Sequence, residues 1–88
     1  MCELDPNNLL GHYNIGMVKI ILGDHKGAIS DFDKVIGMNP KYRWAYHNRG
    51  IAKSKAGDVA GACMDWNRAF ELGSKVSLEL MKTHCNLS

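Results

Sequence analysis

Three cysteines and four histidines are the residues of this chain best suited to bind a metal ion or to act as nucleophiles. Zinc sites are normally marked by paired ligands such as Cys-x2-Cys or His-x3-His, and neither pairing occurs. Cys63 lies between Ala62 and Met64 and is predicted to be a small buried hydrophobic residue. A disulfide from Cys63 to Cys85 would tie the last helix to the one before it, but its geometry is demanding, so we expect free thiols. We predict no metal site and no cofactor.

The acidic side chains do not form a recognisable catalytic set. We expect Asp31, Asp33 and Asp65 to form the solvated face of two helices. They lack the partner residues that would make them catalytic carboxylates, and no nucleophile and base can be paired. The sequence therefore predicts no catalytic residue, and we expect that the chain is not an enzyme.

Two asparagines, Asn14 and Asn48, are the polar side chains best suited to bind another chain. An amide donates and accepts hydrogen bonds at once, so it can bond the backbone of an extended peptide without reading its sequence. Both amides could equally satisfy groups within their own fold. The residue types alone leave these two roles open.

One segment combines basic and aromatic side chains, which could indicate nucleic-acid binding: Lys41, Arg43, Trp44, Tyr46, His47, Arg49, Lys53 and Lys55. On a helix these residues spread around the circumference, so no single basic stripe forms. The net charge of +2 is also too small to imply nucleic acid or an anionic membrane. We predict no nucleic-acid partner.

The sequence shows no sign of membrane insertion or secretion. No apolar run approaches the roughly 18 to 20 residues that a membrane-spanning helix needs. Met1 is not followed by the basic stretch and apolar core of a signal peptide. We therefore predict no membrane partner, no signal and no transmembrane segment here, and the compartment stays open.

The elements that must position these residues occur twice in the sequence. The first copy contains Asn14, Gly16, Lys19, Gly23, Asp24, Gly27, Ala28 and Asp31, and the second contains Asn48, Gly50, Lys53, Gly57, Asp58, Gly61, Ala62 and Asp65. The offset between the copies is the same at every position. A fixed period of about 34 residues indicates a supersecondary unit that buries its apolar face only by stacking on its neighbours.

Local signals divide each copy into two helices. Gly23 can adopt the left-handed conformation that follows a helix, and Asp24 can accept the free amides of the next helix. The same pair recurs in the second copy as Gly57 and Asp58, and Pro40 ends the second helix. With Asn8 as the first cap, the predicted helices span residues 9–22, 25–38, 42–56, 59–72 and 75–85.

The residues repeated within the period resemble the tetratricopeptide repeat. The positions that match its structural pattern are Gly16, Ala28, Phe32 and Pro40 in the first copy and Gly50, Ala62 and Trp66 in the second. Small residues let the helix axes approach, while the aromatic residues fill the space between hairpins. Lys19 and Lys53 stand where the family favours Tyr, and Ser74 stands where it favours Pro. We expect each Lys stem to cover a helix contact while its ammonium reaches water.

The resemblance implies an all-α fold in which antiparallel helical hairpins stack as a right-handed superhelix, an α-solenoid fragment with a C-terminal capping helix. Residues 1–88 would form a single domain. Residues 1–8 would be the tail of a preceding repeat, 9–42 and 43–76 two repeats, and 77–88 the capping helix. The missing Pro at Ser74 indicates that the array ends there.

In this family, the first helix of each hairpin lines the concave face and carries most of the function. The resemblance therefore implies a scaffold that binds a peptide segment of a partner protein in a groove formed by Tyr13, Asn14, Met17, Trp44, His47, Asn48, Ile51 and Lys55. Some members grip a terminal carboxylate with a clamp of Lys, Asn and Arg. Tyr13 and Met17 occupy positions where that clamp needs Lys and Asn, so we expect an apolar or weakly acidic segment instead.

A second hypothesis is self-association. The apolar face of the first helix could pair with another copy of the chain and give a homo-oligomer.

Overall fold

The computed structural model describes residues 9–85, which form five helices. They are α1 (Leu9–Leu22), α2 (His25–Met38), α3 (Arg43–Lys55), α4 (Val59–Glu71) and α5 (Lys75–His84). Every predicted boundary that falls in this range agrees to within one residue, and no strand occurs between residues 9 and 85. The predicted repeat tail at 1–8, the Asn8 cap and the end of the chain at 86–88 lie outside the described residues.

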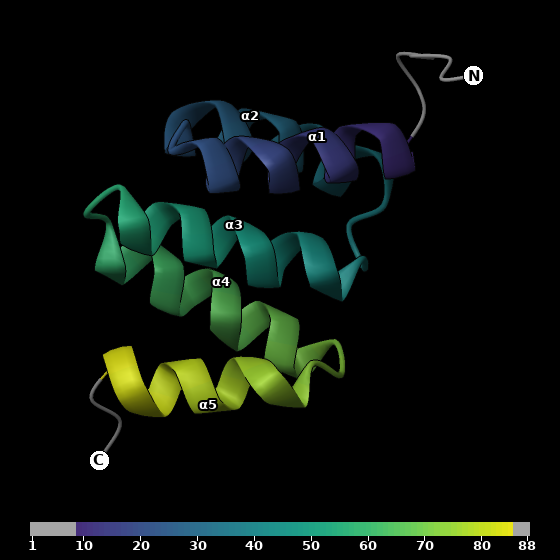
Figure 1. Ribbon diagram of the computed structural model, residues 1–88. Coiled ribbons are helices and arrows are strands. Elements are labelled where there is room, and N and C mark those ends of the chain that lie inside the picture. Colours follow the sequence, from purple (N-terminus) through teal and green to yellow (C-terminus); the bar gives the residue numbers. More distant parts are fainter. Residues whose placement is uncertain (1–8, 86–88) are drawn as a thin grey trace.

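The helices form two antiparallel hairpins followed by a single helix. α1 pairs with α2 and α3 with α4, while α2 also packs on α3 and α4 on α5. Figure 1 shows α1, α3 and α5 following one another down the molecule. Because each unit contacts mainly the next, the predicted all-α solenoid of helical hairpins is confirmed.

The turn inside each hairpin has the predicted chemistry. Gly23 ends α1 with φ of +86°, a conformation that side chains with a Cβ rarely adopt. The Asp24 carboxylate then accepts a hydrogen bond from the Gly27 amide at 3.0 Å, which caps α2. The same contacts recur between α3 and α4, at Gly57 and Asp58. The repeat in sequence is therefore a repeat in local structure.

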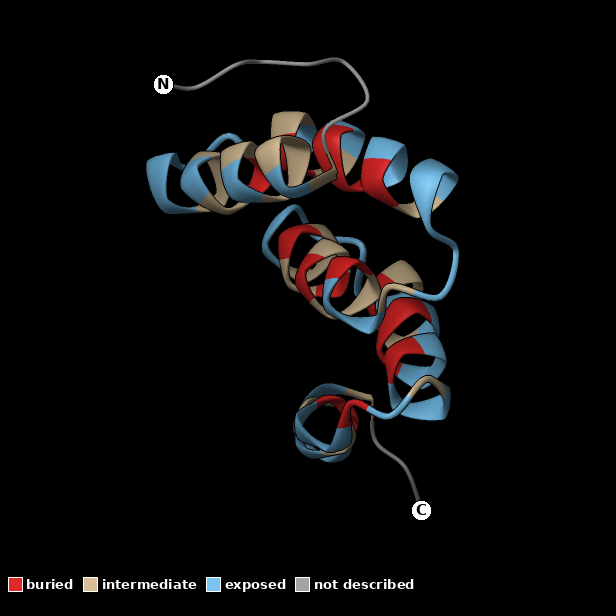
Figure 2. Cartoon of the chain, turned by 90° about the vertical axis from the view of Figure 1, so that its right-hand side faces the viewer, coloured by how far each residue is buried: buried red, intermediate tan, exposed pale blue. Residues whose placement is uncertain are grey.

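Two clusters of buried hydrophobic residues lie in the core, one for each hairpin. Figure 2 shows all buried residues in red. The first contains Ala28, Phe32 and Ala52, with Tyr13, Met17, Ile20 and Ile29 packed against it. The second contains Ala62, Trp66 and Met81, with Ile51, Leu78, Leu80 and Cys85 around it. Both clusters contain residues of two units, so the core is continuous along the stack.

A glycine faces the large aromatic ring in each hairpin. A Cβ added to Gly16 would lie 2.9 Å from the Phe32 ring, and one added to Gly50 would lie 2.5 Å from Trp66 Nε1. The ring therefore occupies the volume that a side chain on the facing helix would need. This contact explains why a glycine stands at this position in both copies.

The prediction that Asp31 and Asp65 face solvent was wrong, although Asp33 is exposed as expected. Asp31 is buried and lies 2.9 Å from Lys19 Nζ. Asp65 is buried too, lies 3.2 Å from Lys53 Nζ and accepts two hydrogen bonds from the Arg49 guanidinium, at 2.7 and 2.9 Å.

The two lysine pairs occupy equivalent positions in the two repeats. A buried carboxylate needs an ionic partner, and the lysine at the family's Tyr position supplies it in each repeat. The hydrogen bond to Asp31 raises the pKa of Lys19, and the Asp65 carboxylate likewise raises the pKa of Arg49. The lysines thus do more than cover the helix contact with their stems.

The expectation of free thiols was also wrong for two of the three cysteines. Cys63 and Cys85 form a disulfide, with their Cα atoms 5.8 Å apart. α5 runs antiparallel to α4, so its C-terminal end reaches the first half of α4. Cys63 is therefore a half-buried link between helices rather than a buried hydrophobic residue.

Candidate peptide-binding groove

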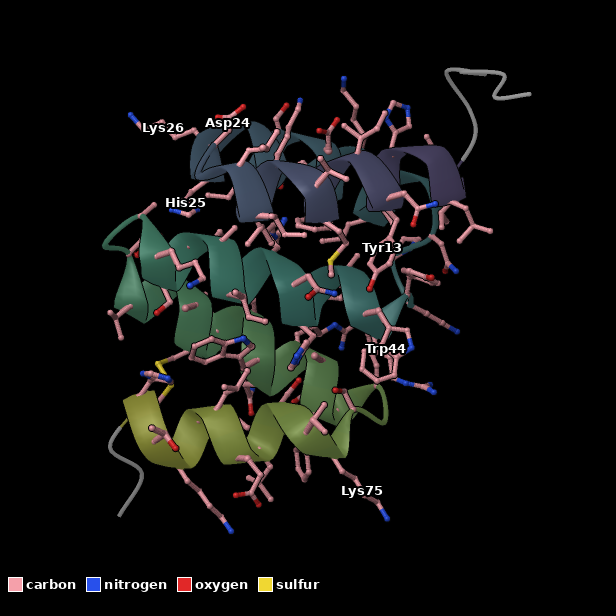
Figure 3. The ribbon with its side chains drawn as sticks, in the orientation of Figure 1. Tyr13, Asp24, His25, Lys26, Trp44 and Lys75 are labelled. Atoms are coloured by element: carbon pink, nitrogen blue, oxygen red, sulfur yellow. A yellow bond between two sulfur atoms is a disulfide. The ribbon has the colours of Figure 1, made fainter. Side chains whose placement is uncertain are left out.

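The eight residues predicted for the groove lie on α1 and α3 and differ in how accessible they are. Asn14, Trp44 and Lys55 are exposed, and Trp44 retains 37% of its accessible surface. Four others are half-buried: Tyr13, Met17, His47 and Ile51. Figure 3 shows Tyr13 and Trp44 on the same side of the molecule, near the start of α3. Contact with another chain is therefore open mainly to the three exposed residues and to the edges of the half-buried ones.

Asn48 is buried and uses its amide inside the protein. Its Nδ2 group donates to the hydroxyl of Tyr13 at 2.7 Å and to the carbonyl of Trp44 at 2.9 Å. Both amide hydrogens are therefore engaged, one of them across the contact between α1 and α3. The sequence left open whether this amide binds a peptide or satisfies groups within its own fold. These hydrogen bonds correspond to the second role.

Tyr13 belongs to the packed interior as much as to the surface. Its ring lies 5.8 Å from the Phe32 ring and 5.5 Å from the Tyr42 ring, centroid to centroid. Burial raises the pKa of Tyr13, and the hydrogen bond from Asn48 opposes this only in part. Tyr13 therefore helps to hold α1 against the residue that precedes α3.

His47 connects α3 to both α4 and α5. Its Nδ1 atom lies 2.7 Å from the Ser77 hydroxyl, which in turn lies 2.9 Å from the Ser74 hydroxyl. Its carbonyl accepts a hydrogen bond from Trp66 Nε1 at 3.0 Å. Burial lowers the pKa of His47. The imidazole thus holds the first turn of α5 against the second hairpin.

The hydrogen bond between Ser74 and Ser77 was not predicted, although Ser74 was noted as a departure from the family's Pro. Both are buried, and Ser74 precedes α5 where the family pattern has Pro. A serine three residues before another, at the start of a helix, is a local signal for such a bond. Its partner on α3, however, depends on how α5 docks. The missing Pro therefore leads into a further helix that sits next to α3 and α4.

Charge is unevenly divided between the helices. α1 and α3 contain no Asp or Glu, whereas α2 and α4 supply the carboxylates that pair with Lys19, Arg49 and Lys53. Arg43 lies over the Trp44 ring, with its guanidinium carbon 5.3 Å from the ring centroid. Lys55 makes no ion pair with any residue between 9 and 85. The exposed part of the predicted groove is therefore positive.

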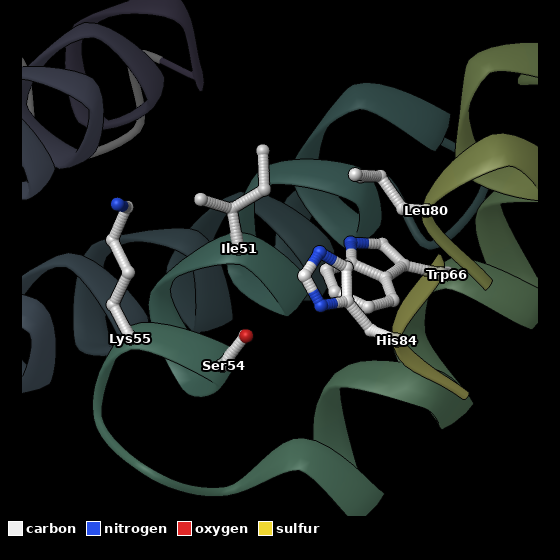
Figure 4. A pocket seen from close by; sticks show the side chains of 6 residues that line it. All are labelled: Ile51, Ser54, Lys55, Trp66, Leu80 and His84. Carbon is white, nitrogen blue, oxygen red and sulfur yellow. The ribbon is translucent and has the colours of Figure 1, made fainter. Parts of the chain in front are cut away.

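A pocket of about 250 Å³ opens at one end of this surface (Figure 4). Its lining comes from three helices: Ile51, Ser54 and Lys55 of α3, Trp66 of α4, and Leu80 and His84 of α5. Ile51 and Lys55 were predicted as groove residues. Trp66 was predicted only as a structural position, and Ser54, Leu80 and His84 were not predicted, because the pocket forms where α5 docks and the repeat period does not describe that contact.

The described residues hold neither a metal cluster nor a membrane span. Within residues 9–85, no group of three or more His, Cys, Asp or Glu side chains is placed to hold a metal ion. None of the described helices has both the length and the apolar character needed to cross a membrane.

Comparisons with known proteins bear on the fold and on the repeat. Residues 11–42 match the family model of the tetratricopeptide repeat, which covers most of the first predicted repeat. Among solved structures, the chain is similar to the first TPR of Spaghetti (RPAP3) bound to the HSP90 peptide SRMEEVD. The TM-score is 0.87 at 24% identity, over 93% of this chain and 67% of that one. No curated protein sequence matches the chain.

Proposed function

Because the chain is a tetratricopeptide-repeat protein, with a fold used for protein–protein interaction, we propose that it binds an extended segment of a partner protein along α1, α3 and α5. The domain of Spaghetti (RPAP3) that shares this fold is bound to a peptide. Extended peptides suit such a surface because a row of parallel first helices presents side chains at regular intervals along one face.

The observation that carries this proposal is the charge division between the helices. The acidic residues of the two hairpins lie on α2, α4 and their caps, and three of them pair with cations reaching over from α1 and α3: Asp31, Asp33 and Asp65. Exposed Lys55 and Arg43 are left beside Trp44 and Ile51. A surface with unpaired cations among apolar side chains suits a segment that is apolar and weakly acidic.

The same residues argue against tight binding of a terminal carboxylate in the usual clamp. Tyr13 and Met17 stand where the clamp has charged or polar side chains, but both are uncharged and pack against the core cluster around Phe32. Neither can supply the cation that binds a carboxylate. The acidic peptide SRMEEVD is therefore a useful reference ligand, and we expect it to bind more weakly than a segment that also carries apolar side chains for the Trp44 edge.

The test is a selection from a displayed library of random nine-residue peptides, followed by titration of the selected peptides using isothermal titration calorimetry, which needs no tryptophan as reporter. Trp44→Ala and Lys55→Glu should each weaken binding at least several-fold, since Trp and cationic residues contribute strongly at interfaces. Lys26→Glu is the matched control, because Lys26 projects from α2 away from α3 (Figure 3). If Trp44→Ala, Lys55→Glu and the control variant all bound the peptides equally well, the proposed groove would not be the binding site.

One observation favours self-association as a second candidate function. Four apolar side chains of α1 are exposed: Leu10 at 58%, Val18 at 51%, Ile21 at 80% and Leu22 at 75%. The residue equivalent to Val18 in the second repeat is Ala52, which is fully buried against the first hairpin. In the second repeat, this position is buried because the first hairpin packs on it. A second copy of the chain could cover Val18 in the same way.

Sedimentation over a wide concentration range tests this second candidate. A dimer that Val18→Lys abolishes and Met64→Lys leaves intact would support it, because Met64 is 74% exposed on α4. A monomer at every concentration would contradict it, and would leave the peptide-binding proposal untouched.

A further inference from the structure

The pocket between α3, α4 and α5 is the feature that adds most to the proposed function, on which the following inference rests. It continues the positive surface from Lys55 toward the end of α5, and four of its six lining residues lie outside the predicted groove. Its volume of about 250 Å³ is below the range of about 300 to 1,000 Å³ typical of small-molecule sites. That size suits one large side chain.

Two aromatic residues line the pocket: His84, which is exposed, and Trp66, which retains only 1% of its accessible surface. The His84 ring lies 5.5 Å from the Trp66 ring, centroid to centroid, with 39° between the planes. Trp66 cannot turn freely, since its Nε1 atom donates to the His47 carbonyl and Gly50 lies close against its ring. Ile51 and Leu80 complete an apolar lining around these rings. A planar side chain can stack on the exposed His84 ring.

The rim of the pocket is polar on one side. Lys55 reaches it with an ammonium that has no carboxylate partner between residues 9 and 85, and Ser54 adds a hydroxyl (Figure 4). A ligand with a carboxylate just outside the pocket would pair with this cation. Cys85, the neighbour of His84, is joined to Cys63 of α4 by the disulfide.

We propose that this pocket binds an aromatic side chain of the partner segment, with the carboxylate of an adjacent acidic residue paired to Lys55. The exposed His84 ring, which lies against Trp66, selects a planar group over an aliphatic one. Lys55 sets the position of the acidic residue next to it. The partner segment therefore contains an aromatic residue followed or preceded by Asp or Glu.

The probes are three capped dipeptides: acetyl-Phe-Asp-amide, acetyl-Leu-Asp-amide and acetyl-Phe-Asn-amide. Binding is followed by the NMR shifts of the Trp66 indole N–H in the full chain. Phe-Asp should bind roughly tenfold more tightly than Leu-Asp because of ring stacking, and about two- to fivefold more tightly than Phe-Asn. Lys55→Met should remove the difference between the Asp and Asn dipeptides and leave the preference for Phe.

A variant that fills the pocket separates this inference from the groove. Ser54→Leu places a larger side chain on the rim and should abolish Phe-Asp binding, whereas Ser30→Leu on the exposed side of α2 should not. If Phe-Asp binds no better than the other dipeptides, or if Ser54→Leu has no effect, the pocket assignment is wrong. Selected nine-residue peptides that still respond to Trp44→Ala would then show that the groove stands without the pocket.

Discussion

Trp66 and Gly50 show how little freedom single residues have where two helices touch. The ring fills the space that a Cβ at position 50 would need, at 2.5 Å from Trp66 Nε1. The indole cannot retreat without losing its hydrogen bond to the His47 carbonyl. The position of the Trp66 ring is therefore fixed by the Gly50 backbone and by the hydrogen bond to His47.

Gly50→Ala should destabilise the protein by about 1 to 2 kcal/mol, because the overpacking cost of about 1 to 3 kcal/mol exceeds the gain in helix propensity of at most about 1 kcal/mol. Gly37→Ala is the control. Gly37 also lies in a helix, but nothing is within 4 Å of its added Cβ, so this variant should be stabilised by about 0.5 to 1 kcal/mol. Urea unfolding measures both. Changes of the same sign in the two variants would contradict the packing argument.

His47 should make stability depend on pH. Burial lowers its pKa below the ordinary value of 6.5, so the unfolded chain takes up a proton more readily than the folded protein. The contribution of neutral His47 to the free energy of unfolding should thus be complete above pH 6.5. It should be lost as the pH falls through the lower pKa of the folded state.

The measurement is urea unfolding at about pH 7.5 and about pH 5.5. In His47→Gln, the loss of stability between these two values should be smaller than in the parent protein. A loss of the same size in both proteins would assign the pH dependence to other groups.

α5 is the element whose attachment depends most on a single bond. It packs on α4 through Met81 and Leu78, and the Cys63–Cys85 disulfide closes its far end. Closing a loop of this length stabilises a protein by about 3 kcal/mol in the chain-entropy treatment. The bond also lies next to His84, which lines the pocket.

Reduction, or the double variant Cys63→Ala with Cys85→Ala, should lower the free energy of unfolding by about 3 kcal/mol. Hydrogen exchange should rise first in α5 and leave α2 protected, since α2 packs on α1 and α3 whereas α5 packs on α4. Adding reductant to the double variant is the control and should change nothing. Identical unfolding of the oxidised and reduced parent protein would show that the bond does not hold α5.

The helices could be predicted almost to the residue because their boundaries depend on neighbours in sequence, such as Gly23 with Asp24. Contacts between helices that are distant in sequence could not be predicted in this way. The burial of Asp31 and Asp65 depends on lysines of the facing helix, although the recurrence of Lys19 with Asp31 as Lys53 with Asp65 was a readable signal. The disulfide and the pocket depend on the docking of α5, for which the two copies provide no template.

At the scale of the whole molecule, the division of charge should appear in the salt dependence of binding. The cations left over on the α3 side are exposed, so their attraction for an acidic segment is screened by ions. Raising the sodium chloride concentration from about 0.05 to about 0.5 M should lower the affinity for a selected acidic peptide several-fold, mainly by slowing association. Lys55→Met should reduce this dependence, whereas Lys26→Met should not. Affinity independent of salt would mean that apolar contact alone carries binding.

The disulfide has a mechanical consequence as well. Cys63 and Cys85 are separated by 22 residues in sequence but by only 5.8 Å between their Cα atoms. An extended chain spans about 3.5 Å per residue, so the bridge withholds roughly 70 Å of contour length from a molecule stretched by its two ends. In an optical trap, the oxidised protein should lengthen by that much less than the reduced one. Under tension, the segment from Cys63 to Cys85, which contains most of α4 and all of α5, stays closed as a loop even after the helices have unfolded.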